Sequence, residues 1–144
     1  MNIFEVIEYF EQIIPLDLQE SYDNCGLQVG NIQQELTNAL IAFDITEKTI
    51  AEAVEKNCNL ILSHHPLIFQ GIKKITGANA SERIIEQAIK NNICIYCAHT
   101  CLDNNYQGLN MFVAGKIGLQ DVKILEPSKN LLKKLVVFCP VDHA

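Results

Sequence analysis

The sequence of 144 residues has no tryptophan and little positive charge: 11 Lys and Arg stand against 17 Asp and Glu, which gives a formal net charge of −6. A general DNA- or RNA-binding protein needs a basic face to neutralise phosphates. Electrostatic docking on an anionic membrane needs basic residues as well. We therefore expect neither nucleic acid nor a membrane surface as a partner.

Long apolar runs are also missing, because no stretch approaches the roughly 18 residues that a membrane span requires. Residues 1–5 include the acidic Glu5 and no basic residue, whereas a secretory signal peptide begins with a basic segment. These features predict a cytoplasmic protein, in which the six cysteines stay reduced. The sequence has neither G-x-x-x-x-G-K-[ST] nor G-x-G-x-x-G, which argues against a standard nucleotide-binding loop. It also lacks the G-x-S-x-G motif of a nucleophile elbow.

Hydrophobic residues make up 49% of the chain, enough for a buried core. Their periodicity predicts strands that alternate with helices, which indicates an α/β fold with a largely parallel sheet. Residues 21–30, with two glycines, have the composition of a structured loop. The predicted helices cover residues 2–14, 46–57, 81–91 and 105–117, the predicted buried strands cover 39–43, 60–62 and 93–98, and two further short strands are expected at 122–125 and 135–138.

Polar residues follow the first three predicted strands. Asp44 follows strand 39–43, His64 and His65 follow strand 60–62, and residues 99–104 follow strand 93–98. In parallel α/β sheets, ligand-binding and active sites lie at the carboxyl ends of the strands. We therefore expect these three segments to meet at one edge of the sheet.

The adjacent His64 and His65 are the sharpest feature of the sequence. On extended backbone the two side chains point to opposite sides, so they suit two ions, or one ion only if they lie on a loop. Pro66 favours an extended conformation for His65, and imidazole binds Zn, Fe, Ni, Cu and Mn. Asp103 adds a carboxylate that can bridge two ions. The alternatives are a surface and a core histidine, and Asp103 as the N-cap of the helix at 105–117.

Two further residues each have two alternative interpretations. His99 either orients a ligand through a hydrogen bond or fills a half-buried strand end. Asp44 either supports a ligand in the same way or caps the helix that follows it. Three neighbours in the predicted loop, Tyr22, Asp23 and Asn24, either line a pocket or form an ordinary turn.

The spacing also allows a rival zinc site. On an extended strand, four residues two positions apart would share one face: Cys97, His99, Cys101 and Asp103. A straight strand, however, spreads these four residues over roughly 20 Å at ~3.3 Å per residue. Cys94 and Cys97 have C-x-x-C spacing, but in a strand they face opposite sides. Buried packing is therefore the favoured role for that pair.

Four segments in order carry a resemblance to a known family. They are Tyr-Asp-Asn-Cys-Gly-Leu-Gln-Val-Gly at 22–30, Ala-Phe-Asp-Ile-Thr at 42–46, Leu-Ser-His-His-Pro-Leu-Ile-Phe at 62–69 and Ala-His-Thr-Cys-Leu-Asp at 98–103. Together they resemble the amino-terminal part of the Nif-three-like family, whose bacterial members are named type 2 GTP cyclohydrolase I homologues. Tyr22 stands where the family usually has Trp, and Cys101 stands where Asn is common.

The resemblance implies a three-layer α/β fold with a mixed sheet, a ring-shaped hexamer, and a site for two divalent ions (Zn, Fe, Mn or Ni). His64 and His65 match the paired ligands, one to each ion, and Asp103 matches the carboxylate ligand. Six further residues are then expected around the ligands or in the pocket: Asp44, His99, Tyr22, Asp23, Asn24 and Cys101. The implied activity is that of a metal-dependent hydrolase with a bridging water and a nucleotide-like substrate. The alternative is a non-catalytic interaction or scaffolding module.

The resemblance also divides the chain. Residues 1–128 match the amino-terminal α/β half of the dinuclear-metal domain, and residues 129–144 resemble a linker and the first strand of an inserted ferredoxin-like domain. In the family a further His and a Glu from a carboxyl-terminal half close the site. We therefore expect a truncated family domain, which binds metal weakly and has little or no activity alone.

Overall fold

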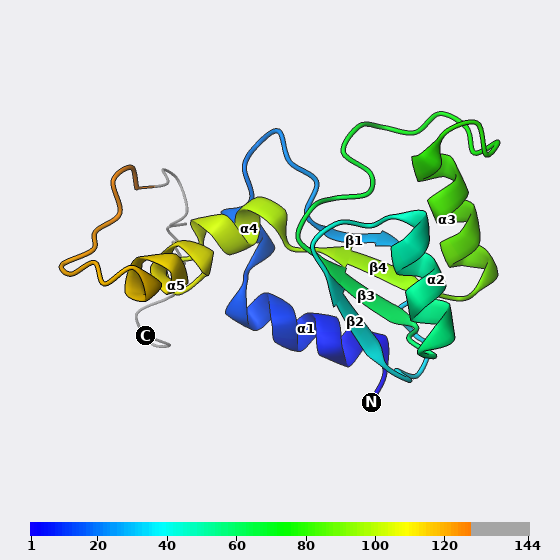
Figure 1. Ribbon diagram of the computed structural model, residues 1–144, viewed down its shortest axis with the longest axis horizontal. Helices are drawn as coiled ribbons and strands as arrows, with labels where there is room; N and C mark the ends of the chain where they lie inside the picture. Colours follow the sequence, from blue (N-terminus) through cyan, green and yellow to red (C-terminus); the bar gives the residue numbers. More distant parts are fainter. Residues whose placement is uncertain (128–144) are drawn as a thin grey trace, which may run out of the picture.

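The computed structural model describes residues 1–127. This part contains a four-stranded sheet with the strand order β1-β4-β3-β2 (Figure 1). Strands β2, β3 and β4 are parallel, and β1 runs antiparallel to β4 at one edge. The strands are β1 (Gly26–Val29), β2 (Ala39–Ala42), β3 (Leu60–Ser63) and β4 (Cys94–Cys97). The predicted mixed, largely parallel sheet is confirmed.

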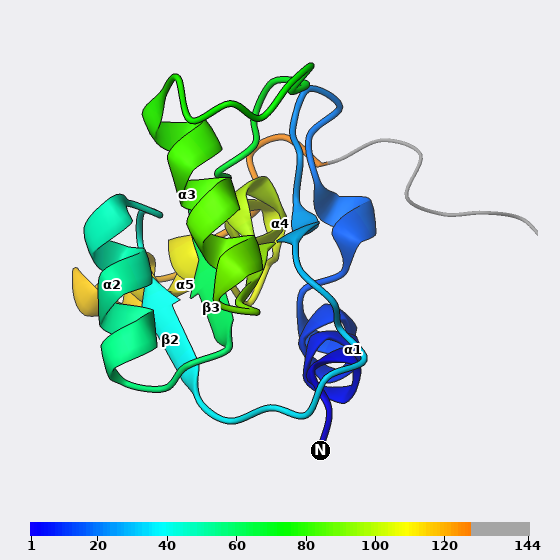
Figure 2. The same ribbon diagram turned by 90° about the vertical axis from the view of Figure 1, so that its right-hand side faces the viewer.

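Helices cover both faces of the sheet and form three layers (Figure 2). Helix α1 (Ile3–Ile13) packs on one face, and helices α2 (Glu47–Glu55) and α3 (Ala80–Lys90) pack on the other. The 3₁₀ turn η1 (Leu16–Leu18) and the helices α4 (His99–Asn104) and α5 (Leu109–Lys116) follow outside these layers. No helix in the described part of the chain is long and apolar enough to cross a bilayer.

Side-chain caps fix where three helices begin. Asn2 and Glu5 form a capping box on α1, with both hydrogen bonds at 2.8 Å, as their spacing predicts. Thr46 caps α2 by accepting from the backbone N–H of Thr49. Asn79 caps α3 in the same way. These caps satisfy backbone donors that the first helical turn leaves unpaired.

The core lies on both faces of β3 and β4, because alternate residues of a strand point to opposite sides. Ile61 and Ile95 face α2 and α3 and are both fully buried. Leu60 and Tyr96 face α1. The Tyr96 hydroxyl donates to Glu11 at 3.1 Å, so its polar end has a partner inside the layer interface.

Four expectations from the sequence are wrong. Strand 39–43 is not buried: β2 is an edge strand, and Ile41 is 81% exposed. The predicted loop at 21–30 contains β1, which pairing with β4 stabilises. The predicted helix at 105–117 is interrupted by a turn at 105–108, and residues 122–125 form irregular structure without strand pairing. The strand expected at 135–138 and the segment 129–144 lie outside the described residues.

Gly30 is a position at which the fold requires glycine. Its φ is +108°, and an added Cβ would lie 2.6 Å from the Cys94 sulfur and 2.7 Å from the Cys94 Cα. Both the backbone conformation and the close approach to β4 exclude a side chain.

We expect Gly30→Ala to reduce the free energy of unfolding by about 2 kcal/mol or more, because it adds a steric clash to an unfavourable φ. Urea denaturation measures this change. Gly71→Ala is the matched control, since a Cβ at Gly71 meets no atom within 4 Å. Equal losses in the two variants would show that the contact with Cys94 is relieved by a small shift.

Candidate metal centre

Three histidines gather at the carboxyl end of the parallel strands. His64 and His65 follow β3 directly, and His99 opens α4 directly after β4. One ring nitrogen of each lies within 4.8 Å of the others. The ring centroid of His64 lies 5.0 Å from that of His65 and 5.4 Å from that of His99. We call these three residues the histidine cluster.

The backbone of His64 and His65 is held from both sides. Their N–H groups donate to Ala42 and Phe43, at 3.2 and 3.0 Å, so the pairing with β2 continues past the end of the strands. On the other side, the N–H of His99 donates to the carbonyl of His64 at 3.0 Å. This hydrogen bond brings His99 to the pair, although 34 sequence positions separate it from His65.

Two carboxylates lie beside the cluster. Asp44 Oδ1 is 2.7 Å from Nδ1 of His65, which makes Asp44 the support of a candidate ligand. Thr46 caps the helix that follows, so the capping alternative for Asp44 is wrong. Asp103 Oδ2 is 3.9 Å from Nε2 of His64. This residue lies inside α4, one turn after His99, so it does not serve as the N-cap of a helix at 105.

Asp23 holds the third imidazole. Its Oδ1 is 2.8 Å from Nδ1 of His99, and its Oδ2 accepts from the N–H and the hydroxyl of Thr100. The backbone N–H of Asn24 and the thiol of Cys25 also donate to it. Burial raises the pKa of Asp23, but these hydrogen bonds, those from Thr100 and His99 foremost, outweigh burial and hold the pKa well below its ordinary value.

The surroundings of His64 lower its pKa, which favours the neutral imidazole. Burial lowers the pKa of His64, and the neighbouring His65 and His99 lower it further, while Asp103 acts in the opposite direction. The ring of Phe43 stacks on His64, with centroids 5.1 Å apart and an interplanar angle of 14°. A neutral imidazole has a free lone pair, which is the form that binds a metal.

Other residues singled out from the sequence lie elsewhere. Tyr22 is 66% exposed, and in residues 1–127 no hydrogen bond or ring contact joins it to the histidine cluster. Asn24 donates to the carbonyl of Ile68 at 2.6 Å and so ties the loop after His65 to the segment before β1. Cys101 is buried, and its thiol faces the carbonyl of Leu16 at 3.7 Å.

The rival zinc site on one strand is wrong. Cys97 ends β4, whereas His99, Cys101 and Asp103 lie in α4, so the four residues do not share one extended face. Cys94 and Cys97 are both fully buried, as predicted for packing residues. Burial raises the pKa of the Cys97 thiol to about 12, which disfavours the thiolate that zinc would bind.

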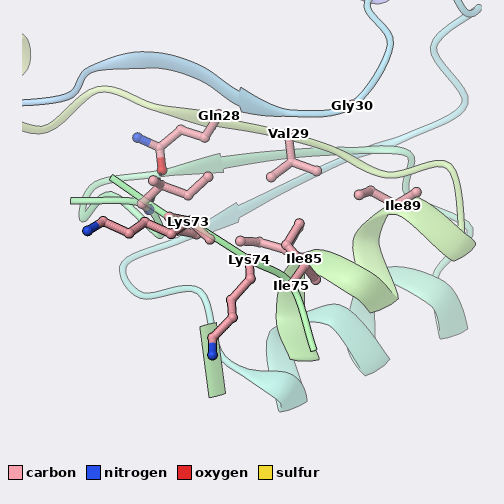
Figure 3. A pocket seen from close by; sticks show the side chains of 10 residues that line it. Gln28, Val29, Gly30, Lys73, Lys74, Ile75, Ile85 and Ile89 are labelled. Carbon is pink, nitrogen blue, oxygen red and sulfur yellow. Dashed lines mark hydrogen bonds between the residues drawn. The ribbon is translucent and has the colours of Figure 1, made fainter. Parts of the chain in front are cut away.

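A hollow of about 620 Å³ lies apart from the histidine cluster, between β1, the loop 68–75 and α3 (Figure 3). Val29 and Ile85 are among the apolar side chains that line it, and the ammonium groups of Lys73 and Lys74 extend away from them. None of the three histidines lines this hollow.

Comparison with known proteins identifies the chain. The family model Duf34/NIF3 (NGG1p interacting factor 3) matches residues 1–142. The chain belongs to this family. A relative from Halalkalibacterium halodurans, named GTP cyclohydrolase 1 type 2 homolog, is 42% identical over 139 residues, which is 96% of this chain and 37% of the relative. A Bacillus subtilis protein of the same name is 36% identical and covers 99% of this chain, with 39% of its own length.

Solved structures of the NIF3 family agree with the fold. The Bacillus cereus protein related to NIF3 has a TM-score of 0.84 and 41% identity over 89% of this chain and 36% of that one. Reduced HcgD from Methanocaldococcus jannaschii has a TM-score of 0.79 and 34% identity over 85% of this chain and 49% of that one. This NIF3-family chain thus spans about two fifths of the length of the curated relatives that it matches.

Acid should weaken this NIF3-family fold through Asp23. Its carboxylate is stabilised in the folded state, so the unfolded state binds the proton first, below the ordinary Asp pKa of about 3.9. The stabilisation is present above that pH and is lost as the pH falls toward the lower pKa of the folded state. We expect the loss of unfolding free energy between about pH 7 and about pH 3 to be smaller in Asp23→Asn than in the wild type. Urea denaturation at both pH values tests this, with exposed Asp17→Asn as the control that should behave like the wild type.

Proposed function

We propose that this chain binds a divalent metal ion at the histidine cluster, with Asp103 as a further donor. We also propose that, within a full-length family member, the site serves a metal-dependent hydrolase of the GTP cyclohydrolase type 2 homologue kind. The observation that carries the proposal is that three imidazole nitrogens lie within 4.8 Å of one another. Three imidazole nitrogens from two separate strand ends supply the kind of donors that a zinc-type site uses.

The donor set fits a metal ion. Imidazole together with carboxylate suits Zn, Fe, Mn and Ni, and burial lowers the pKa of His64, which favours its neutral, metal-binding form. When bound, a divalent ion supplies Lewis acidity, which polarises a carbonyl oxygen and acidifies water. A second ion, which the family resemblance implies, would need donors beyond these four, and we propose that a carboxyl-terminal half of a full-length family member supplies them.

The residues around the cluster would orient a substrate. Phe43 is 62% exposed and stacks on His64, and Phe69 is 49% exposed with its ring 6.4 Å from that of His99. Two aromatic surfaces beside the cluster suit a planar ring. These features support a nucleotide-like substrate for the full-length protein.

A titration tests metal binding directly. We expect chelator-treated protein to bind Zn²⁺ or Mn²⁺ saturably, at no more than one ion per chain, in competition with a chromophoric chelator. The chain alone should release no formate from GTP, because the four donors do not complete a two-ion site. Tight binding of two ions would contradict the incomplete site, and the absence of saturable binding would contradict the proposal itself.

A protein-interaction module is the second candidate, and an exposed apolar face beside β2 favours it. Ile41 is 81% and Phe43 62% exposed, and a hollow of about 460 Å³ lies between α1, the ends of β2 and β3, and α4. We propose that this face contributes to a homo-oligomer, a hexamer in the full-length family member. If interaction is the main function, His64→Ala should leave the mass measured by light scattering unchanged. A change in assembly would link the histidine cluster to the interface.

A further inference from the structure

The two carboxylate–histidine pairs that lie within hydrogen-bond distance differ in their surroundings. The side chains of Asp44 and His65 are 60% and 44% exposed, so water competes for their hydrogen bond. The side chain of Asp23 is fully covered, and that of His99 is 21% exposed. The covered pair lacks this competition, and it therefore fixes the geometry of its imidazole more firmly.

The groups that donate to Asp23 determine which atom is the donor in the hydrogen bond between Asp23 and His99. The backbone N–H groups of Asn24 and Thr100 point at Oδ1 and Oδ2, respectively. A backbone N–H only donates, so each carboxyl oxygen must accept. The pKa of Asp23 lies well below its ordinary value, so the group is ionised and has no proton to donate. His99 Nδ1 shares Oδ1 with the N–H of Asn24, and it must therefore carry the proton of this hydrogen bond. In the neutral imidazole this leaves Nε2 with the lone pair.

We propose that Asp23 is a positioning residue that holds His99 in the tautomer protonated at Nδ1, which leaves Nε2 as the nitrogen available to the histidine cluster. As a statement about metal binding the inference rests on the proposed function, but the tautomer is a property of the metal-free chain. Through Asp23, the segment that precedes β1 orients a candidate ligand 76 positions further along the sequence.

The link also explains the position of the loop before β1. Glu20 donates its backbone N–H to the Thr100 hydroxyl at 3.1 Å, and that hydroxyl donates to Asp23. These bonds join the loop to the first turn of α4 next to His99. The Thr100 hydroxyl can be removed without touching the pair of Asp23 and His99, which separates a structural role from a positioning one.

Nitrogen-15 NMR of the histidine rings tests the inference on metal-free protein at about pH 8, above the ordinary His pKa of about 6.5. We expect His99 of the wild type to show a protonated Nδ1 and an unprotonated Nε2. In Asp23→Ala this preference should be lost, while the pattern of His65 stays unchanged. Thr100→Val, the isosteric control, should keep the His99 pattern although it loses the hydroxyl bonds.

A protonated Nε2 of His99 in the wild type would overturn the inference, and this result does not depend on whether any variant folds. An unchanged His99 pattern in folded Asp23→Ala would overturn it as well. For metal affinity, we expect Asp23→Ala to weaken binding about 10- to 100-fold and Asp44→Ala to weaken it less. If the wild type shows the expected tautomer but binds no metal, the proposed function fails and the positioning role stands.

Discussion

His64→Ala is expected to weaken the binding of Zn²⁺ or Mn²⁺ at least about 100-fold, more than the loss of a residue that only supports a ligand. His64 contacts both other imidazoles and faces Asp103, so its removal takes away the centre of the donor set. Its side chain is only 15% exposed, and water replaces such a donor poorly. Competition titration against a chromophoric chelator measures the affinity.

Asp103→Asn should have a smaller effect in the same titration, about 10-fold, because the amide keeps one oxygen but loses the charge. Glu52→Gln is the matched control, since Glu52 is paired with Lys56 on the surface of α2. Its affinity should equal that of the wild type. Unchanged affinity in folded His64→Ala would remove the histidine cluster from consideration as the metal site.

Ile61→Ala is expected to reduce the free energy of unfolding by about 2–5 kcal/mol, the usual cost of truncating a fully buried isoleucine. Ile61 lies on β3, has no exposed surface and packs in the core between the sheet and helices α2 and α3. Because small domains are stable by only about 5–15 kcal/mol, this is a large share of the total. Urea denaturation gives the value.

Ile41→Ala is the matched control, with the same substitution on the neighbouring parallel strand. Ile41 pairs with Leu62 in register but is 81% exposed. Its truncation should cost less than about 1 kcal/mol. If the two variants lose similar stability, Ile41 is buried in solution, which would indicate that the face beside β2 is covered by a second copy.

Local signals in the sequence predict much of this fold. Asn2 with Glu5 and Thr46 mark the starts of α1 and α2 because capping depends on residues three positions apart. The apolar runs at β3 and β4 predict buried strands because both faces of these strands are covered. The same signals place His64, His65 and His99 after parallel strands, and therefore at one edge.

What the sequence does not predict depends on distant partners. Gly26 and its neighbours have loop composition, and they form β1 only because β4 offers an unpaired edge. Helix α4 begins directly at the end of β4 with Ala98 as its N-cap, which makes no side-chain hydrogen bond, so no local signal marks its start. The hydrogen bond between His99 and Asp23 escapes prediction for the same reason, because Asp23 lies in a different segment.

The strand order has a consequence for how the chain is made. The strand β4 pairs with both β1 and β3, yet it is the last of the four strands in the sequence. During synthesis the first ninety or so residues therefore leave the ribosome with the middle of their sheet missing. Until β4 emerges, β1 has no partner, and Asp23 cannot reach His99. Assembly then depends on contacts between remote segments, which are slow to form, so nascent chains should need protection from aggregation until about residue 100 has been translated.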